Sequence, residues 1–177
     1  MSRCATWLAL EMENRGWDPV QVRLRDLKVG PCNGCFHCWT RTPGLCDQDD
    51  DGRELTRQLA QVEALVLVTP VRYGGYSSLV KRSLERAVLP FLLPFFTEVH
   101  GEVHHPLRYG RKVRLAALGC LPKPDPDSES LFQKILQRNA LNFHATDPPS
   151  AFVYGDLSQV EAQGRVAALA GALGGAE

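Results

Sequence analysis

The sequence predicts an α/β domain in which a parallel sheet carries helices on both faces. Helical and strand-like segments alternate strictly along the 177 residues, in the order α-β-α-β-α-β-α-β-α, and such alternation favours a parallel sheet. The segments 64–70 and 112–120 are strongly apolar, as is typical of strands buried on both faces. The length predicts a single domain over residues 1–177 with one core.

The first third of the chain predicts two helices and two strands. Residues 2–15 form a helix that Gly16 ends, in the usual place for a glycine beyond a C-terminus. Residues 20–27 alternate apolar and charged side chains, which indicates a strand with one wet face near a sheet edge. Residues 49–64 form a helix whose early acidic residues suit the positive end of its dipole, and the strand 64–70 follows.

The remainder continues the alternation. Residues 78–92 predict a helix that Pro90 ends or kinks. The polar segment 97–111 is irregular, and the strand 112–120 follows it. The last elements are predicted as a helix at 129–143, a strand at 150–155 and a helix at 157–173.

Composition excludes several classes of partner. The 20 basic residues balance the 20 acidic residues, so no charge excess points to nucleic acid. No stretch approaches the roughly 18 apolar residues of a spanning helix, and the N-terminus lacks the features of a secretory signal. We therefore expect a cytosolic protein without a membrane partner. In a reducing cytosol, clustered cysteines favour metal binding or redox chemistry over disulfides.

Four of the six cysteines lie close together, with the spacing C-x2-C-x2-C-x7-C: Cys32, Cys35, Cys38 and Cys46. Three interpretations stay open. Four thiolates at such spacing suit a [4Fe–4S] cluster. They also suit zinc, although the spacing is tighter than in most zinc sites. The third interpretation is a loop whose cysteines are small buried apolar residues. Cys4 and Cys120 lie apart and are expected to be core thiols.

The loop "TPVRYGGYSS" follows the strand 64–70 at the place where an open α/β sheet binds ligands. Thr69 offers a hydroxyl, Gly74 and Gly75 expose backbone N–H groups, and Tyr73 and Tyr76 offer rings that can stack on a flat ligand such as a flavin. An ordinary strand-to-helix turn explains the same residues. The second loop, which begins at Gly119, is proline-rich and poor in N–H donors.

The histidines and acidic residues carry weaker signals. His37 lies within the cysteine segment and is expected to be exposed rather than a ligand. The three histidines of segment 97–111 could bind a metal, but a surface hairpin is the favoured interpretation. The aspartates at 47, 49, 50 and 51 could bind a cation, and capping of the following helix is the simpler interpretation.

The segments "PCNGCFHCWTRTPGLCDQDDD" and "ALVLVTPVRYGGYSSLVKRSLER" together resemble the NAD(P)H-dependent FMN reductase and iron–sulfur flavoprotein family. The matching residues of the first segment are Pro31, Cys32, Gly34, Cys35, Cys38, Trp39, Gly44, Cys46, Asp49 and Asp50. Those of the second are Thr69, Pro70, Val71, Tyr73, Leu79, Lys81, Glu85 and Arg86. The resemblance is close over residues 2–89 and continues by element order.

The resemblance implies a flavodoxin-like three-layer α/β/α sandwich with strand order 2-1-3-4-5, FMN as cofactor and NAD(P)H as reductant. It also implies a small-molecule electron acceptor, a homodimer, and a [4Fe–4S] cluster on the four clustered cysteines. The candidate FMN-binding residues are Ser2, Thr69, Pro70, Val71, Arg72, Tyr73, Gly74, Gly75, Tyr76 and Gly119.

One departure from the family pattern concerns the N-terminus. The family places a strand and a phosphate-binding loop before the first helix, and only Ser2 and Arg3 match the end of that loop. We therefore expect FMN to bind weakly or not at all. The leading hypothesis is a flavin-dependent oxidoreductase. The alternatives are an electron-transfer or redox-sensing module built on the cysteines, and a truncated relative without a cofactor.

Overall fold

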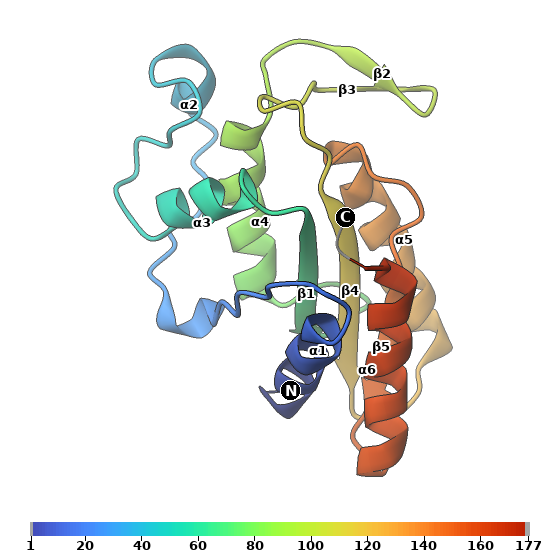
Figure 1. Ribbon diagram of the computed structural model, residues 1–177. Coiled ribbons are helices and arrows are strands. Elements are labelled where there is room, and N and C mark those ends of the chain that lie inside the picture. The colour runs from blue at the N-terminus through green and yellow to red at the C-terminus, as the bar shows by residue number, and fades with distance from the viewer. Residues whose placement is uncertain (1, 176–177) are drawn as a thin grey trace.

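The computed structural model describes residues 2–175, the side chain of Ser2 excepted, and has the predicted flavodoxin-like α/β architecture (Figure 1). Its main sheet holds three parallel strands in the order β1 (Ala64–Pro70), β4 (Arg114–Leu121) and β5 (Ser150–Tyr154). The register places Thr69 of β1 beside Gly119 of β4, and Gly119 beside Phe152 of β5. The C-terminal ends of the strands therefore meet at one end of the sheet.

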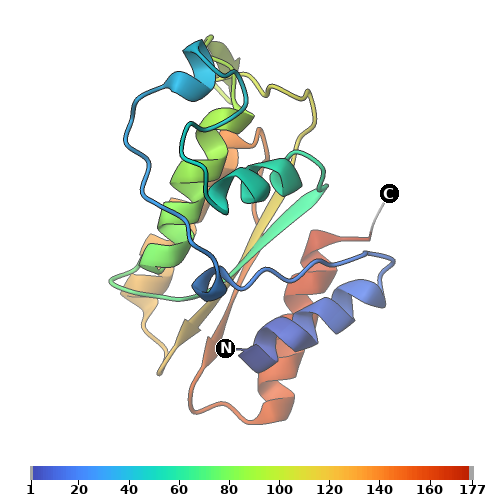
Figure 2. The same cartoon turned by 90° about the vertical axis from the view of Figure 1, so that its left-hand side faces the viewer.

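Helices cover both faces of this sheet. Helix α1 (Ser2–Glu13) and helix α6 (Gln159–Leu173) lie side by side on one face, and α4 (Ser78–Phe91) and α5 (Pro126–Asn142) lie on the other (Figure 2). Helix α3 (Gly52–Leu59) packs against α4. None of the helices in the described part of the chain is long and apolar enough to cross a membrane.

Strand β4 is the centre of the core because it is buried on both faces. Its side chains alternate in direction, so Leu115 and Ala117 pack toward α4 and α5 while Ala116 and Leu118 pack toward α1 and α6. All four residues are at most 1% exposed. Strand β1 is less buried, because it forms one edge of the sheet in the described residues.

The helix ends follow their sequence signals. Gly16 has φ of +84° just beyond α1, a conformation that glycine adopts without strain. Ser158 and Glu161 form a capping box at the start of α6. Pro90 lies in the last turn of α4, one residue before the helix ends, as its missing N–H and its ring predict.

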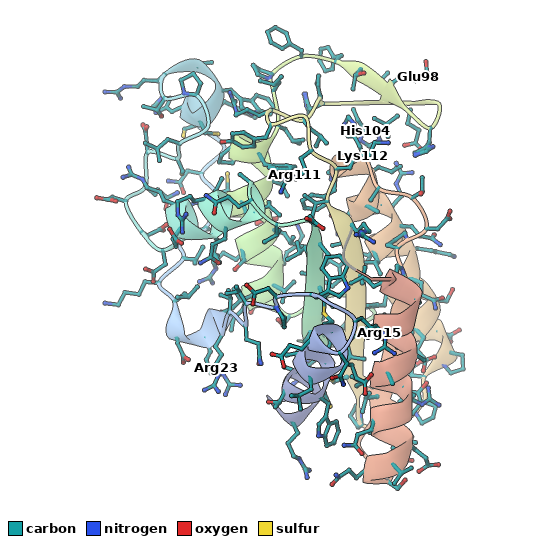
Figure 3. The ribbon with its side chains drawn as sticks, viewed as in Figure 1. Arg15, Arg23, Glu98, His104, Arg111 and Lys112 are labelled. Carbon is teal, nitrogen blue, oxygen red and sulfur yellow. The ribbon has the colours of Figure 1, made fainter. Side chains whose placement is uncertain are left out.

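The prediction of a strand at residues 20–27 is wrong. This segment is extended coil followed by a short 3-10 turn, η1 (Leu24–Asp26). Val20 is 72% exposed, and Arg23 points away from the rest of the molecule beside η1 (Figure 3). An alternating pattern makes a strand only if its backbone N–H and C=O groups find a neighbouring strand. In residues 2–175 no strand lies beside this segment.

Segment 97–111 is more regular than its polarity suggests. It contains a two-stranded antiparallel hairpin, β2 (Thr97–Val99) with β3 (Glu102–His104). His100 and Gly101 make the turn with φ of +51° and +79°, as a two-residue hairpin loop requires. The expected hairpin is therefore present, with His100 in its turn and His104 in β3, while His105 follows it.

Candidate functional site

The cysteine segment lies along α4 at the end of the sheet where the strands begin (Figure 1). It contains one short helix, α2 (His37–Thr40). The indole Nε1 of Trp39 in this helix donates a 2.6 Å hydrogen bond to the carbonyl of Leu89, near the end of α4. Arg108 links the two, because it donates to the carbonyl of Cys38 (3.5 Å) as well as to those of Pro90 (2.9 Å) and Leu92 (3.1 Å). The segment is thus attached to the C-terminal turn of α4.

A buried arginine on α4 joins both ends of the cysteine segment. Arg86 is only 2% exposed. Its Nη1 and Nη2 each lie 2.8 Å from one carboxylate oxygen of Asp50, which follows the last cysteine. Nη1 also donates to the carbonyl of Gly30, just before the first cysteine, at 3.0 Å, and to the side chain of Gln48 at 3.1 Å. We call this group of residues the Arg86 clamp.

The Arg86 clamp is ionised on both sides. Burial opposes the charge on Arg86, but the hydrogen bonds to Asp50 and the nearby Cys46 raise its pKa above the ordinary value. Burial also opposes the charge on Asp50, but hydrogen bonds from Arg86 and from the N–H groups of Gly30 and Gly52 lower its pKa. The pKa of Arg86 rises and that of Asp50 falls, and each shift favours the charged form of its group.

Two glycines make room for this pair. A Cβ on Gly30 would lie 2.5 Å from Gln48 Oε1, and a Cβ on Gly52 would lie 2.9 Å from Asp50 Oδ1. Both distances are shorter than a side chain tolerates without displacing its neighbour. Glycine therefore stands at both positions because clamp side chains lie too close for a Cβ, and neither glycine needs an unusual backbone conformation.

The four clustered thiols line one small cavity beside the Arg86 clamp: Cys32, Cys35, Cys38 and Cys46. Burial raises the pKa of the Cys38 thiol, and the other three cysteines raise it further. Among the described residues, no three His, Cys, Asp or Glu side chains converge closely enough to hold a single metal ion. All six cysteines are free thiols. Cys120 and Cys4 lie together in the core, where burial raises the pKa of Cys120 to about 11.

The donor set of this cavity fits an iron–sulfur cluster. Four thiols face the same space, as a [4Fe–4S] cluster requires. Arg86 Nε is buried and has no hydrogen-bond acceptor. A buried N–H without an acceptor is rare in folded proteins, and a sulfur-rich anion in the cavity would supply one. Cys32, Cys35, Cys38 and Cys46 would hold the cluster.

His37 and the neighbouring aspartates have structural partners. The Nδ1 of His37 hydrogen-bonds to Asp47 across the cysteine segment. Asp51 accepts from the N–H of Lys28 at 2.6 Å, and Asp49 pairs with Arg53 at 2.8 Å. The side chain of Asp51 makes no cap bond to α3, so these residues fasten the cysteine segment rather than simply capping the helix.

The candidate flavin loop lies at the opposite end of α4, beyond the C-terminal ends of β1 and β4. Thr69 is fully buried, and its hydroxyl accepts from Ser77 N–H (3.1 Å) and donates to Pro70 C=O (3.1 Å). The backbones of Arg72 and Gly75 bond to each other in both directions and close a tight turn. Thr69 therefore fixes the base of the loop, while its tip is free to contact a ligand.

The aromatic residues of this loop differ in exposure. Tyr73 is fully exposed, with φ of +50°. Tyr76 is 8% exposed, packs edge-on against Phe132 and accepts a 3.2 Å bond from Asn139. Burial raises the pKa of Tyr76. Of the two rings, the one at position 73 is placed to stack on a ligand.

The remaining residues of the predicted flavin site form its floor. Val71 is buried and its N–H bonds to the carbonyl of Cys120 at 3.0 Å. A Cβ on Gly119 would lie 2.7 Å from the ring of Phe152, so protein atoms fill that space. Gly74 is buried against Leu131. The side chain of Ser2 lies outside the described part of the chain.

Two features of this region could not be read from spacing. One is the pairing of Arg86 with Asp50: both residues match the family motifs, but nothing in the motifs shows that they meet. The other is a run of ring contacts, Phe36–Trp39–His105–Phe96, with centroid separations of 5.3, 4.8 and 5.4 Å. This run connects the cysteine segment to the chain beside the β2–β3 hairpin, which the sequence pattern does not indicate.

The fold and these two sites define a flavodoxin-like α/β protein with a cysteine-rich loop. Residues 2–117 match the family model described as NADPH-dependent FMN reductase. Because this match covers more than half of the chain, the chain belongs to that family.

Among curated proteins, an iron-sulfur flavoprotein of Archaeoglobus fulgidus is 33% identical over 81 residues, which are 46% of this chain and 36% of the relative. An iron-sulfur flavoprotein of Methanocaldococcus jannaschii is 30% identical over 66 residues, 37% of this chain and 33% of the relative. The matched segments thus span about a third of the length of these relatives.

Solved structures share the fold over nearly the whole chain. An FMN-dependent NADH-azoreductase of Bacillus anthracis, in complex with FMN, superposes with a TM-score of 0.61 at 12% identity, covering 97% of this chain and 88% of that one. An oxidoreductase of Corynebacterium diphtheriae gives a TM-score of 0.53 at 14% identity, covering 97% and 83%. At these identities the likeness establishes the fold alone.

Proposed function

We propose that this chain is an FMN-dependent NAD(P)H oxidoreductase. The observation that carries the proposal is the family match over residues 2–117, which includes both the cysteine segment and the loop after β1. The flavin would supply the redox chemistry, taking two electrons as hydride from NAD(P)H and releasing them to a small acceptor. The chain's own contribution is to bind, orient and tune the flavin.

The loop after β1 is the proposed flavin site. It lies at the C-terminal ends of two parallel strands, where open α/β sheets bind ligands. Exposed Tyr73 offers a ring for stacking, and Arg72 is exposed beside it to pair with an anionic group. The buried hydroxyl of Thr69 holds the loop from below.

The cysteine cavity is the proposed cluster site. A [4Fe–4S] cluster held there by Cys32, Cys35, Cys38 and Cys46 would exchange single electrons, whereas a flavin handles one or two. The Arg86 clamp fixes the segment that carries the thiols.

A second candidate function is an electron-transfer or redox-sensing module. It is favoured by the separation of the two sites, which lie at opposite ends of α4. Fourteen residues at 1.5 Å each span about 21 Å. A cysteine site so far from the flavin loop within one chain can serve a partner of its own. This candidate predicts a cluster or reactive thiols without oxidation of NAD(P)H.

Anaerobic purification followed by absorption spectroscopy separates these functions. Flavin bands together with oxidation of NADH or NADPH support the oxidoreductase, and the FMN dissociation constant tests the expectation of weak binding. A broad visible absorption that dithionite bleaches supports the cluster, and Cys46→Ser should lose it while Cys120→Ser keeps it. A colourless protein that takes up neither FMN nor an iron–sulfur cluster would refute both proposed functions. Light scattering on the same samples tests the predicted homodimer.

A further inference from the structure

Arg86 has one N–H group that the clamp does not use. A guanidinium carries five N–H donors. The four on Nη1 and Nη2 face Asp50, Gly30 and Gln48, at distances from 2.8 to 3.4 Å. The fifth, on Nε, is buried without an acceptor. Its residue is only 2% exposed, so this N–H is shielded from bulk solvent.

The residue that carries this unused donor lines the cysteine cavity. Arg86 lines the cavity together with the four thiols. Of the four cysteines, Cys46 is the one whose side chain interacts with the guanidinium of Arg86. A neutral thiol is a poor acceptor, whereas a thiolate bound to iron is negatively charged and a good one. A cluster bound in this cavity would therefore place good sulfur acceptors beside the residue that carries the unused Nε donor.

A hydrogen bond to a cluster ligand changes the energy of reduction. One electron entering a bound cluster would increase the negative charge on its sulfurs, and an N–H donor would stabilise that charge. The donor keeps its proton, and no bond to Arg86 forms or breaks. The electron comes from reduced flavin in the proposed function and from dithionite in a titration.

We propose that Arg86 Nε donates a hydrogen bond to the Cys46 sulfur of the loaded site and thereby raises the reduction potential of the [4Fe–4S] cluster. Arg86 is a positioning residue in this role, in addition to holding the loop. The inference rests on the cluster part of the proposed function and is independent of flavin binding.

The test compares midpoint potentials of the reconstituted chain. Wild type, Arg86→Lys and Arg53→Lys are loaded anaerobically with ferrous iron and sulfide, and reduction is followed by electron paramagnetic resonance. Lysine keeps the charge at position 86 but removes Nε. Arg53 is the matched control, because its Nε bonds at 2.9 Å to the backbone carbonyl of Cys46 rather than to the thiol.

We expect Arg86→Lys to disfavour reduction about tenfold, which is a shift of about 59 mV to more negative potential for a one-electron couple. Arg53→Lys should leave the potential near that of wild type. Equal potentials in wild type and Arg86→Lys would overturn the inference. A purely mechanical clamp would lower iron content and stability in the variant without moving the potential.

A second measurement covers the case in which Arg86→Lys fails to fold or load. Wild-type chain labelled with ¹⁵N-arginine is loaded and reduced, and pulsed electron paramagnetic resonance measures coupling of the cluster spin to ¹⁵N. A resolved coupling supports the hydrogen bond, and its absence overturns it. Wild type that takes up no iron and sulfide overturns the inference as well. A loaded chain without FMN or NAD(P)H oxidation would instead refute the oxidoreductase and leave the inference standing.

Discussion

Arg86 and Asp50 form a two-pronged ion pair, with both nitrogen–oxygen distances at 2.8 Å and the arginine side chain 1% exposed. The pair connects α4 to the chain 36 residues earlier. Removal of one member of such a pair leaves the other charge buried without a partner. The position of the cysteine segment therefore depends on this contact.

Asp50→Ala should destabilise the protein strongly. It leaves the buried guanidinium of Arg86 without its carboxylate, which costs about 3 kcal/mol or more in comparable pairs. Urea denaturation gives the free energy of unfolding. Asp49→Ala is the control, since that side chain is 87% exposed and its pair with Arg53 is worth about 0.5 kcal/mol. Equal effects of the two substitutions would show that the clamp is not a stabilising contact.

Acid should weaken this contact in a defined direction. Because the folded pKa of Asp50 is below its ordinary value, its contribution to stability is complete above the unfolded pKa of about 3.9 and is lost as pH falls through the lower folded pKa. Other carboxylates with lowered pKa, among them Glu102 at about 2, also make the unfolding free energy depend on pH, and they do so equally in wild type and variant. The difference in unfolding free energy between wild type and Asp50→Asn isolates Asp50. It should shrink as pH falls below 4, and a constant difference would contradict the assignment.

Two glycine-to-alanine substitutions should have opposite signs. At Gly52 the new Cβ meets Asp50 Oδ1 at 2.9 Å and Arg86 Nη2 at 3.1 Å, so we expect a loss of about 1–3 kcal/mol. At Gly164, inside α6, nothing lies within 4 Å, so alanine should stabilise by about 0.5–1 kcal/mol through helix propensity. Thermal denaturation of both variants checks the pair. A stabilising Gly52→Ala would show that Asp50 and Arg86 can move aside for the new Cβ at little cost.

Trp39→Phe should loosen the cysteine segment from α4. It keeps most of the ring but removes the hydrogen bond to Leu89 C=O, which contributes about 1 kcal/mol. Hydrogen exchange of residues 37–46 should become faster. Trp7→Phe is the matched control, because Trp7 packs against the opposite face of the sheet. Unchanged exchange in Trp39→Phe would show that other contacts hold the segment.

Tyr73→Ala tests the proposed flavin loop without disturbing the core. Its side chain is fully exposed, so the free energy of unfolding should stay within about 0.5 kcal/mol of wild type. Loss of stacking on the flavin ring should weaken FMN binding by roughly 2- to 12-fold, from about 0.5–1.5 kcal/mol per aromatic pair. Fluorescence titration with FMN gives the dissociation constant. An unchanged constant would place the flavin away from this residue.

Local sequence patterns predicted the elements whose stability is local or whose burial is complete. Helix α1 was expected at residues 2–15 and ends at Glu13, and β5 was expected at 150–155 and ends at Tyr154. Capping residues and continuous apolar runs carry this information in neighbouring positions. The helix expected at 49–64 spans only Gly52–Leu59, and the three aspartates before it bond instead to Arg53, Arg86 and the N–H of Lys28.

The sequence by itself determined the α/β class, the family and the set of four cysteines, since each depends on residue type and spacing. Only the tertiary structure decided that residues 20–27 form no strand, because strand formation requires backbone partners that a pattern cannot supply. It also decided that Arg86 meets Asp50 and that the cysteine cavity and the proposed flavin loop lie at opposite ends of α4. Contacts between distant segments arise when the chain closes on its core, and no local signal records them.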